Sequence, residues 1–165
     1  TMRRKREELK NSRRKEMIGF RKIDPEVAME KNTWFHLGRN SCEEILYCLR
    51  RIADPCEEHV DNNFVPLSKE QVKEYIPLRD TVLFLLRRTE KILQTDSYDE
   101  VDEVRREAEE LKDCLEKARE AQMQRMQSSK ENIAVAYLYL NLLQETRELT
   151  SSLRHLLRAS KGFRE

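Results

Sequence analysis

The densest group of residues with the chemistry to bind a ligand lies in residues 54–61, within a predicted helix. Glu57 and Asp61 are four residues apart, so both carboxylates face one side of a helix. Asp54 and Glu58 share a neighbouring face at the same spacing. Paired carboxylates on a bundle helix hold carboxylate-bridged metals when a facing helix supplies a matching set.

The facing set would come from the last predicted helix, where Glu145 lies close to Glu148 and Asn141 in sequence. We therefore predict a divalent or iron-type metal site at Glu57 and Asp61, to which Asp54, Glu58 and Glu145 would contribute further ligands. The alternative interpretation is an exposed acidic helix face with Asp54 as a cap. A di-iron site of the Glu-x-x-His type is not expected, because the sequence contains no Glu-x-x-His.

A basic face near the C-terminus is the second candidate, formed by Arg147, Arg154, His155 and Arg158. It would bind a phosphate-bearing ligand, or pair with acids on neighbouring helices and with the helix dipole. Aromatic residues are not interleaved with it, so nucleic acid is not expected as a partner. The sequence also has no Gly-rich phosphate loop, nucleophile elbow or H-E-x-x-H motif, and we do not expect an enzyme.

The four cysteines are Cys42, Cys48, Cys56 and Cys114, and none forms a C-x-x-C pair. Cys48 and Cys56 are spaced to lie on one apolar helix face. They are expected to be small buried hydrophobes in a reducing compartment, since a zinc site would need more closely clustered ligands.

Composition indicates the secondary structure on which these residues lie. Charged residues make up 38% of the 165 residues and only three are Gly, which is typical of long helices. Apolar residues recur in steps of three and four, as in a helix-bundle seam, at Val101, Val104, Ala108, Leu111, Leu115 and Ala118. We predict an all-α, up-down antiparallel bundle with helices at about 3–21, 25–63, 69–95, 98–126 and 129–160.

Local signals set these boundaries. Asp24 caps a helix that begins at Pro25, and Gly162 is expected to end the last helix. Pro77 should kink its helix, and at Pro55 the helix should kink or restart. Capping boxes are predicted at Ser68-x-x-Gln71, Ser97-x-x-Glu100 and Ser128-x-x-Glu131.

The charge is distributed unevenly between the N-terminal segment and the bundle. Residues 1–22 carry ten Lys or Arg against three Glu, a net +7, so the rest of the +1 chain carries about −6. We divide the chain into a basic helix or linker, 1–23, of the kind found next to membranes, and a bundle, 24–165. The basic segment would otherwise be a solvated helix face or a nucleic-acid arm.

Two stretches resemble a known family. Residues 137–161, YLYLNLLQETRELTSSLRHLLRASK, resemble the end of the C-terminal cytoplasmic domain of bacterial sodium-dependent phosphate cotransporters, which is similar to PhoU, a helical regulator of phosphate uptake. Residues 40–54, NSCEEILYCLRRIAD, look like the corresponding early helix. The resemblance covers about residues 30–161.

The resemblance implies a PhoU-like bundle with a non-catalytic regulatory role at the cytoplasmic face of the inner membrane. Its partner would be the membrane-embedded transporter part of the same chain, with residues 1–23 as the link and Thr1-Met2 as the start of a fragment. PhoU proteins carry E/D-x-x-x-D metal motifs. Glu57 and Asp61 match this spacing once, whereas Glu145 is followed four residues later by Leu149.

A second hypothesis is a free-standing helical bundle that acts as an interaction or scaffold protein, unconnected to phosphate. It requires only the apolar seams. Self-association of such a protein, for example through the helix at 98–126, would give a homo-oligomer.

Overall fold

The computed structural model describes residues 4–5, 7–8, 11, 24–62 and 65–165. It contains four labelled helices: α2, Pro25–Asp61; α3, Lys69–Thr95; α4, Val101–Ser128; and α5, Ile133–Arg164. Residues 4–5, 7–8 and 11 are helical, and the rest of the helix predicted at 3–21 lies outside the described residues. The prediction of an all-α bundle is confirmed.

Two of the predicted helix starts have the expected caps. The Asp24 carboxylate accepts a hydrogen bond from the Glu26 amide at 2.9 Å, with Pro25 at the first helical position. Ser68 and Gln71 form a complete capping box, with bonds of 3.1 and 2.9 Å between side chain and backbone. These two caps fix the first residues of α2 and α3 as the sequence predicts.

The other two capping boxes were predicted wrongly. α4 begins at Val101 behind Glu100, which makes no side-chain cap, and the Ser97 hydroxyl bonds Asp99 instead. α4 then continues through Ser128, and α5 is capped by Asn132, whose side chain accepts from the Val135 amide at 3.1 Å. An Asn closer to the apolar run therefore takes the role assigned to Ser128.

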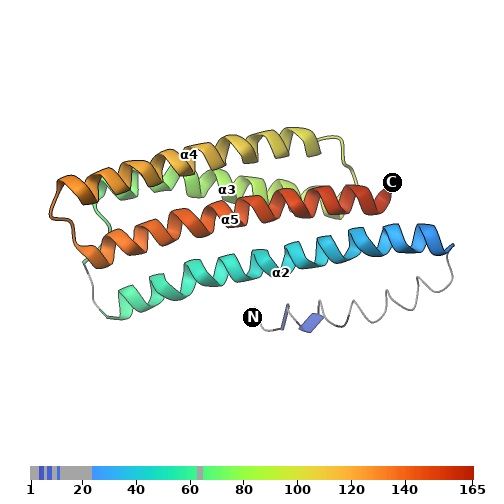
Figure 1. The fold of residues 1–165 in the computed structure, drawn as a ribbon, viewed down its shortest axis with the longest axis horizontal. Helices are drawn as coiled ribbons and strands as arrows, with labels where there is room; N and C mark the ends of the chain where they lie inside the picture. The colour runs from blue at the N-terminus through green and yellow to red at the C-terminus, as the bar shows by residue number, and fades with distance from the viewer. Residues whose placement is uncertain (1–3, 6, 9–10, 12–23, 63–64) are drawn as a thin grey trace.

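α5 is the central helix of the bundle. In Figure 1 it runs between α2 on one side and α4 on the other, with α3 behind, and helices that follow one another in the chain are antiparallel. α5 contacts all three other helices, whereas the backbone of α2 approaches only α5 among the described helices. No described helix is long and apolar enough to cross a membrane.

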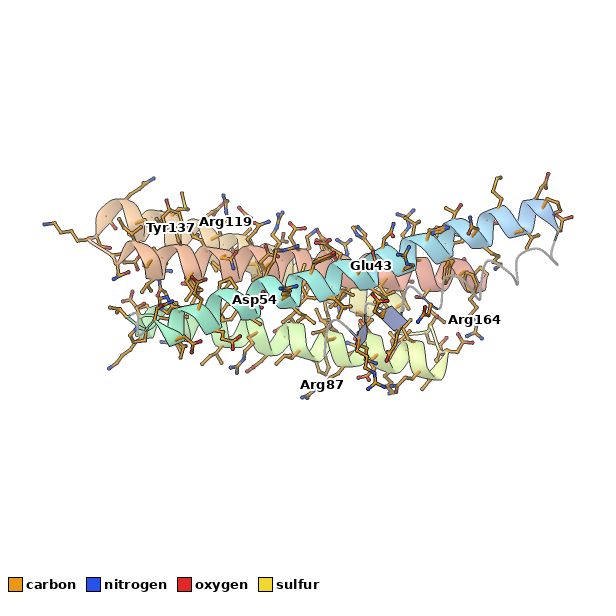
Figure 2. The ribbon with its side chains drawn as sticks, turned by 90° about the horizontal axis from the view of Figure 1, so that it is seen from below. Glu43, Asp54, Arg87, Arg119, Tyr137 and Arg164 are labelled. Atoms are coloured by element: carbon orange, nitrogen blue, oxygen red, sulfur yellow. The ribbon has the colours of Figure 1, made fainter. Side chains whose placement is uncertain are left out.

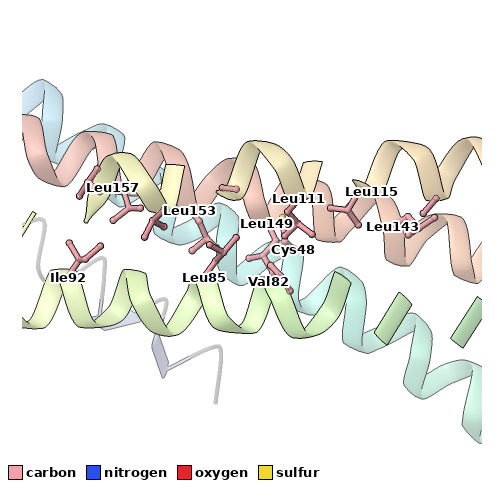
Figure 3. Packing of buried hydrophobic residues seen from close by; sticks show 14 of the residues in the cluster. Cys48, Val82, Leu85, Ile92, Leu111, Leu115, Leu143, Leu149, Leu153 and Leu157 are labelled. Carbon is pink, nitrogen blue, oxygen red and sulfur yellow. The ribbon is translucent and has the colours of Figure 1, made fainter. Parts of the chain in front are cut away.

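The core lies among α3, α4 and α5; α2 contributes the buried Cys48, and its Ile45, Leu49 and Ile52 pack against the cluster (Figure 3). All six residues of the predicted α4 seam are buried, which confirms that helix face. α5 is buried along its whole length, including Leu149, Leu153 and Leu157 in its second half. These leucines belong to the hydrophobic core that α5 shares with α3 and α4.

The helix end expected at Gly162 does not occur, since α5 continues to Arg164. α2 does not restart at Pro55, and α3 is continuous through Pro77. The kinks expected at these two prolines stay predictions. Gly162 is buried, and a Cβ at this position would lie 2.5 Å from the Trp34 ring. The glycine therefore serves close packing between α5 and α2 instead of helix termination.

We expect Gly162→Ala to lower the free energy of unfolding by about 1–2 kcal/mol, because the overlap with Trp34 outweighs the gain in helix propensity. Gly38→Ala is the matched control in α2. Its Cβ would meet Ala159 at 3.6 Å, an ordinary contact, so this variant should be more stable by about 0.5–1 kcal/mol. Urea denaturation followed by circular dichroism measures both, and a stabilised Gly162→Ala would contradict the packing argument.

Candidate functional site

A charged junction joins the middle of α2 to α5. Arg51 donates from Nε to Glu145 at 2.8 Å and from Nη2 to Glu44 at 2.7 Å. Asn141 donates from Nδ2 to the Arg51 carbonyl at 3.0 Å. Glu145 is 9% exposed, and its hydrogen bond is the leading cause of the raised pKa of Arg51. One guanidinium thus binds two carboxylates, one on α2 and one on α5.

The structure places the predicted metal ligands on two different surfaces. Glu57, Glu58 and Asp61 are exposed on the last turns of α2. Asp54, labelled in Figure 2, is exposed and forms an ion pair with Arg50 at 2.9 Å. Glu145, the proposed facing ligand, is bound by Arg51 instead.

Only the carboxylates of α2 therefore still support the prediction of a metal site. Among the described residues, no group of three or more His, Cys, Asp or Glu side chains lies close enough to hold a metal ion. The site at Glu57 and Asp61 stays a prediction from the sequence. Glu145 would join it only by giving up the Arg51 ion pair.

Cys48 lies beside this junction and is fully buried. Burial raises the pKa of its thiol to about 12, with the neighbouring Arg51 acting in the opposite direction. The neutral thiol behaves as a small core side chain, as the sequence predicts. Cys42 and Cys56 are partly buried, and burial raises both thiol pKa values, whereas Cys114 is exposed.

We expect alkylation by iodoacetamide to modify Cys114 quickly and Cys48 only after unfolding, as read by mass spectrometry.

The stability that the neutral Cys48 thiol contributes is full below its ordinary pKa of 9.0 and is lost as the pH rises toward about 12. The free energy of unfolding should therefore fall above pH 9.0 less steeply in Cys48→Ala than in the original protein. Equal slopes would contradict this assignment.

A second group of polar side chains lies inside the bundle at the end where α4 meets α5. We call it the polar cluster, and it consists of Gln71, Glu74, Gln122, Arg125, Glu131 and Tyr139. Gln71, Gln122 and Tyr139 are completely buried. Because buried polar groups are costly unless they are bonded, their hydrogen bonds decide whether this end of the bundle is stable.

Gln122 is the centre of the polar cluster. Its amide oxygen accepts from Gln71 Nε2 at 3.2 Å and from Arg125 Nε and Nη2 at 3.0 and 2.7 Å. Its amide nitrogen donates to Glu131 at 2.6 Å. Gln71 is the glutamine of the α3 capping box, so the same side chain caps α3 and fastens it to α4.

Glu74 connects the polar cluster to α5. It accepts from Arg125 at 3.1 and 3.3 Å and from the Tyr139 hydroxyl at 2.5 Å. Burial, followed by this bond to a carboxylate, raises the pKa of Tyr139, so the hydroxyl keeps its proton and acts as a donor. The Tyr75 ring packs edge-on against the Tyr139 ring, with centroids 6.2 Å apart. The polar cluster thus sets how α3, α4 and α5 align.

The basic face of α5 divides between two environments. Arg154 pairs with Glu109, and Arg147 lies 3.9 Å from Glu116, so two of its members bind acids on α4 as one alternative predicted. His155 and Arg158 instead line a depression of about 530 Å³ between α5 and α2. These two side chains are the part of the basic face that remains for a phosphate-bearing ligand.

A larger apolar cavity of about 720 Å³ lies between α2 and α3. In Figure 2, α2 and α3 diverge toward the end of the bundle where α2 begins. The cavity walls include Ile45 and Leu46 of α2 and Leu86 and Leu93 of α3, with Leu153 of α5 also in the lining. Lys5 and Glu8 are also among its lining residues. We call this opening the α2–α3 groove.

The polar cluster and the α2–α3 groove were not predicted from the sequence. A paired Gln71 and Gln122 gives no periodic signal, and only the seam position of Gln122, four residues after Ala118, could have indicated its burial. Comparisons with protein-family models, curated proteins and solved structures found no match to this chain.

Proposed function

We propose that this chain is a non-catalytic regulatory domain that works through protein contacts, and that it is the PhoU-like domain of a bacterial sodium-dependent phosphate cotransporter. The observation that carries the proposal is the pairing of the two stretches that resemble this family. Residues 40–54 lie in α2 and residues 137–161 lie in α5, and these helices pack on each other. The Arg51–Glu145 pair and the Asn141–Arg51 bond connect the two stretches directly.

A role through contacts is supported by how the polar groups are used. The charged side chains of the α2–α5 junction and the polar cluster bind one another and hold helices together. The α2–α3 groove, in contrast, is lined largely by apolar side chains. Such a surface is suited to taking a helix of another polypeptide or of the same one.

The proposed partner is the membrane-embedded transporter part of the same chain. The net +7 of residues 1–22 supports a position close to the cytoplasmic face of the inner membrane, where positive residues flank membrane helices. In this arrangement the bundle would lie on the cytoplasmic side of the transporter and control phosphate entry through its contacts with the transporter.

The reading frame upstream of Thr1 gives the first test, and we expect it to encode membrane-spanning helices. Sodium-dependent uptake of labelled phosphate is then compared between cells with the intact gene and cells whose gene lacks residues 24–165. Transport should persist in the shortened protein but no longer adjust to phosphate supply. An upstream stop codon, an upstream soluble domain or unchanged regulation would contradict the proposal.

A free-standing interaction or scaffold bundle is the second candidate. Exposed apolar side chains on α3 favour it, including Ile76 and Leu83 at 40% and 44% exposure. An exposed apolar surface can bind a partner protein without any transporter. The upstream reading frame separates the two candidates, since a scaffold protein would have no membrane helices there.

A further inference from the structure

α3 carries a second apolar stripe besides the face that it buries in the core. The core face includes Val82, Leu85 and Ile92. The second stripe lies about a quarter-turn around the helix, toward the α2–α3 groove. It consists of Ile76, Arg79, Leu83, Leu86, Glu90 and Leu93.

This α3 stripe is partly exposed to solvent, and Leu86, Glu90 and Leu93 line the α2–α3 groove. Ile76, Leu83 and Leu93 keep 40%, 44% and 37% of their surface exposed, and Leu86 is partly buried in the wall of the α2–α3 groove. The steps between its six positions are 3, 4, 3, 4 and 3 residues. This spacing is the a/d pattern of a helix that packs against another helix at a small angle.

The order of residues in the α3 stripe is self-complementary. The steps read the same in both directions, so two copies of α3 can pair antiparallel with every position matched. In that register Ile76 faces the partner's Leu93, and Leu83 faces the partner's Leu86. Arg79 then faces the partner's Glu90, so the two polar positions carry opposite charges.

The two polar residues have local contacts that are easily exchanged. Arg79 bonds the adjacent Asp80 at 2.8 Å, with both side chains more than half exposed. Glu90 accepts from Gln94, one turn further along the helix, at 3.2 Å. Exposed ion pairs and hydrogen bonds of this kind contribute little to stability, so a partner's charge can replace them.

We propose that the α3 stripe is the interface of a homodimer in which α3 pairs antiparallel with α3 of a second copy. The two-fold axis passes between positions 84 and 85, and each side presents about 26 Å of helix from Ile76 to Leu93. The α4 seam, the earlier candidate for self-association, is buried inside the bundle and unavailable to a partner. This inference does not depend on the proposed transport function.

Charge reversal tests the register, with the dissociation constant measured by sedimentation equilibrium. Each interface contains the Arg79–Glu90 pair twice. Arg79→Glu or Glu90→Arg therefore creates two like-charge contacts and should weaken the dimer by about tenfold or more. The double variant Arg79→Glu/Glu90→Arg restores opposite charges and should dimerise like the original protein.

A mixture of the two single variants gives the sharpest result. One copy then carries Glu at positions 79 and 90 and the other carries Arg at both, so every facing pair is of opposite sign. The mixture should form a heterodimer, although neither variant dimerises well alone. Arg119→Glu on α4, where Arg119 pairs with Glu116 on an exposed surface, is the control and should leave the dissociation constant unchanged.

The proposal is overturned if the original protein is monomeric at about 0.1 mM, a concentration far above the dissociation constant of a dimer in the micromolar range. A monomer would mean that the α3 stripe is covered by a different partner or by the chain itself, where Lys5 and Glu8 already line the groove. It is equally overturned if the single variants dimerise as well as the original protein, or if their mixture yields no heterodimer.

Discussion

Replacing Gln122 with Ala is expected to lower the free energy of unfolding by about 3 kcal/mol, the largest loss for any polar side chain discussed. The substitution empties a fully buried position and removes the shared partner of Gln71, Arg125 and Glu131. Arg125 keeps its two bonds to Glu74, but the Gln71 amide is left buried without an acceptor. Urea denaturation followed by circular dichroism measures the loss.

Two further variants separate the contributions to this loss. Gln122→Met fills the space but forms none of the amide hydrogen bonds, so it isolates the polar part of the effect and should still cost about 2 kcal/mol. Gln124→Ala removes an exposed glutamine from the same helix and should change stability by less than about 0.5 kcal/mol. Equal stability of Gln122→Met and the original protein would show that the polar cluster contributes no net stability.

Arg51→Ala is the substitution with the next largest expected effect, a loss of about 2–3 kcal/mol. It leaves Glu145 buried without its cation, and removing one partner of a buried pair is strongly destabilising. The value is set below that of a fully buried pair because the Arg51 side chain is 44% exposed. Thermal and urea denaturation should both show the loss.

Arg50→Ala is the matched control for Arg51→Ala. Arg50 is the preceding residue and forms its ion pair with Asp54 in solvent, with both side chains more than half exposed. Its removal should leave the free energy of unfolding almost unchanged. Adding Glu145→Gln to Arg51→Ala should recover much of the loss, because the neutral amide needs no cation. Similar losses for Arg50→Ala and Arg51→Ala would contradict a special role for Glu145.

Much of the fold could be predicted from the sequence because local signals and periodicity agree. α3 has the predicted bounds, 69–95, since a capping box starts it and its apolar pattern is regular. The errors have two causes. At the start of α5 a stronger local signal competes, because Asn132 and not Ser128 caps the helix. Gly162 has the sequence signal of a helix end, but its packing against Trp34, 128 positions away in sequence, leaves no local signal.

The candidate site was harder to predict, because it depends on which residues of distant helices face each other. The acidic residues of α2 were correctly grouped on one helix, but their expected partner Glu145 lies opposite Arg51. Nothing in the spacing of residues 54–61 reveals the register of α2 against α5. Likewise, Gln71 was recognised as a capping residue, while its bond to Gln122 depends on how α3 and α4 align.

The close backbone approach of α2 to α5 has a consequence for synthesis on the ribosome. α2 is the first of the labelled helices to be translated, and α5 is the last. α3 and α4 are neighbours in sequence and can pair as soon as both have emerged, but α2 has no backbone neighbour among the described helices until α5 follows. The apolar face of α2, with Cys48 at its centre, therefore waits through the translation of three further helices before it is covered.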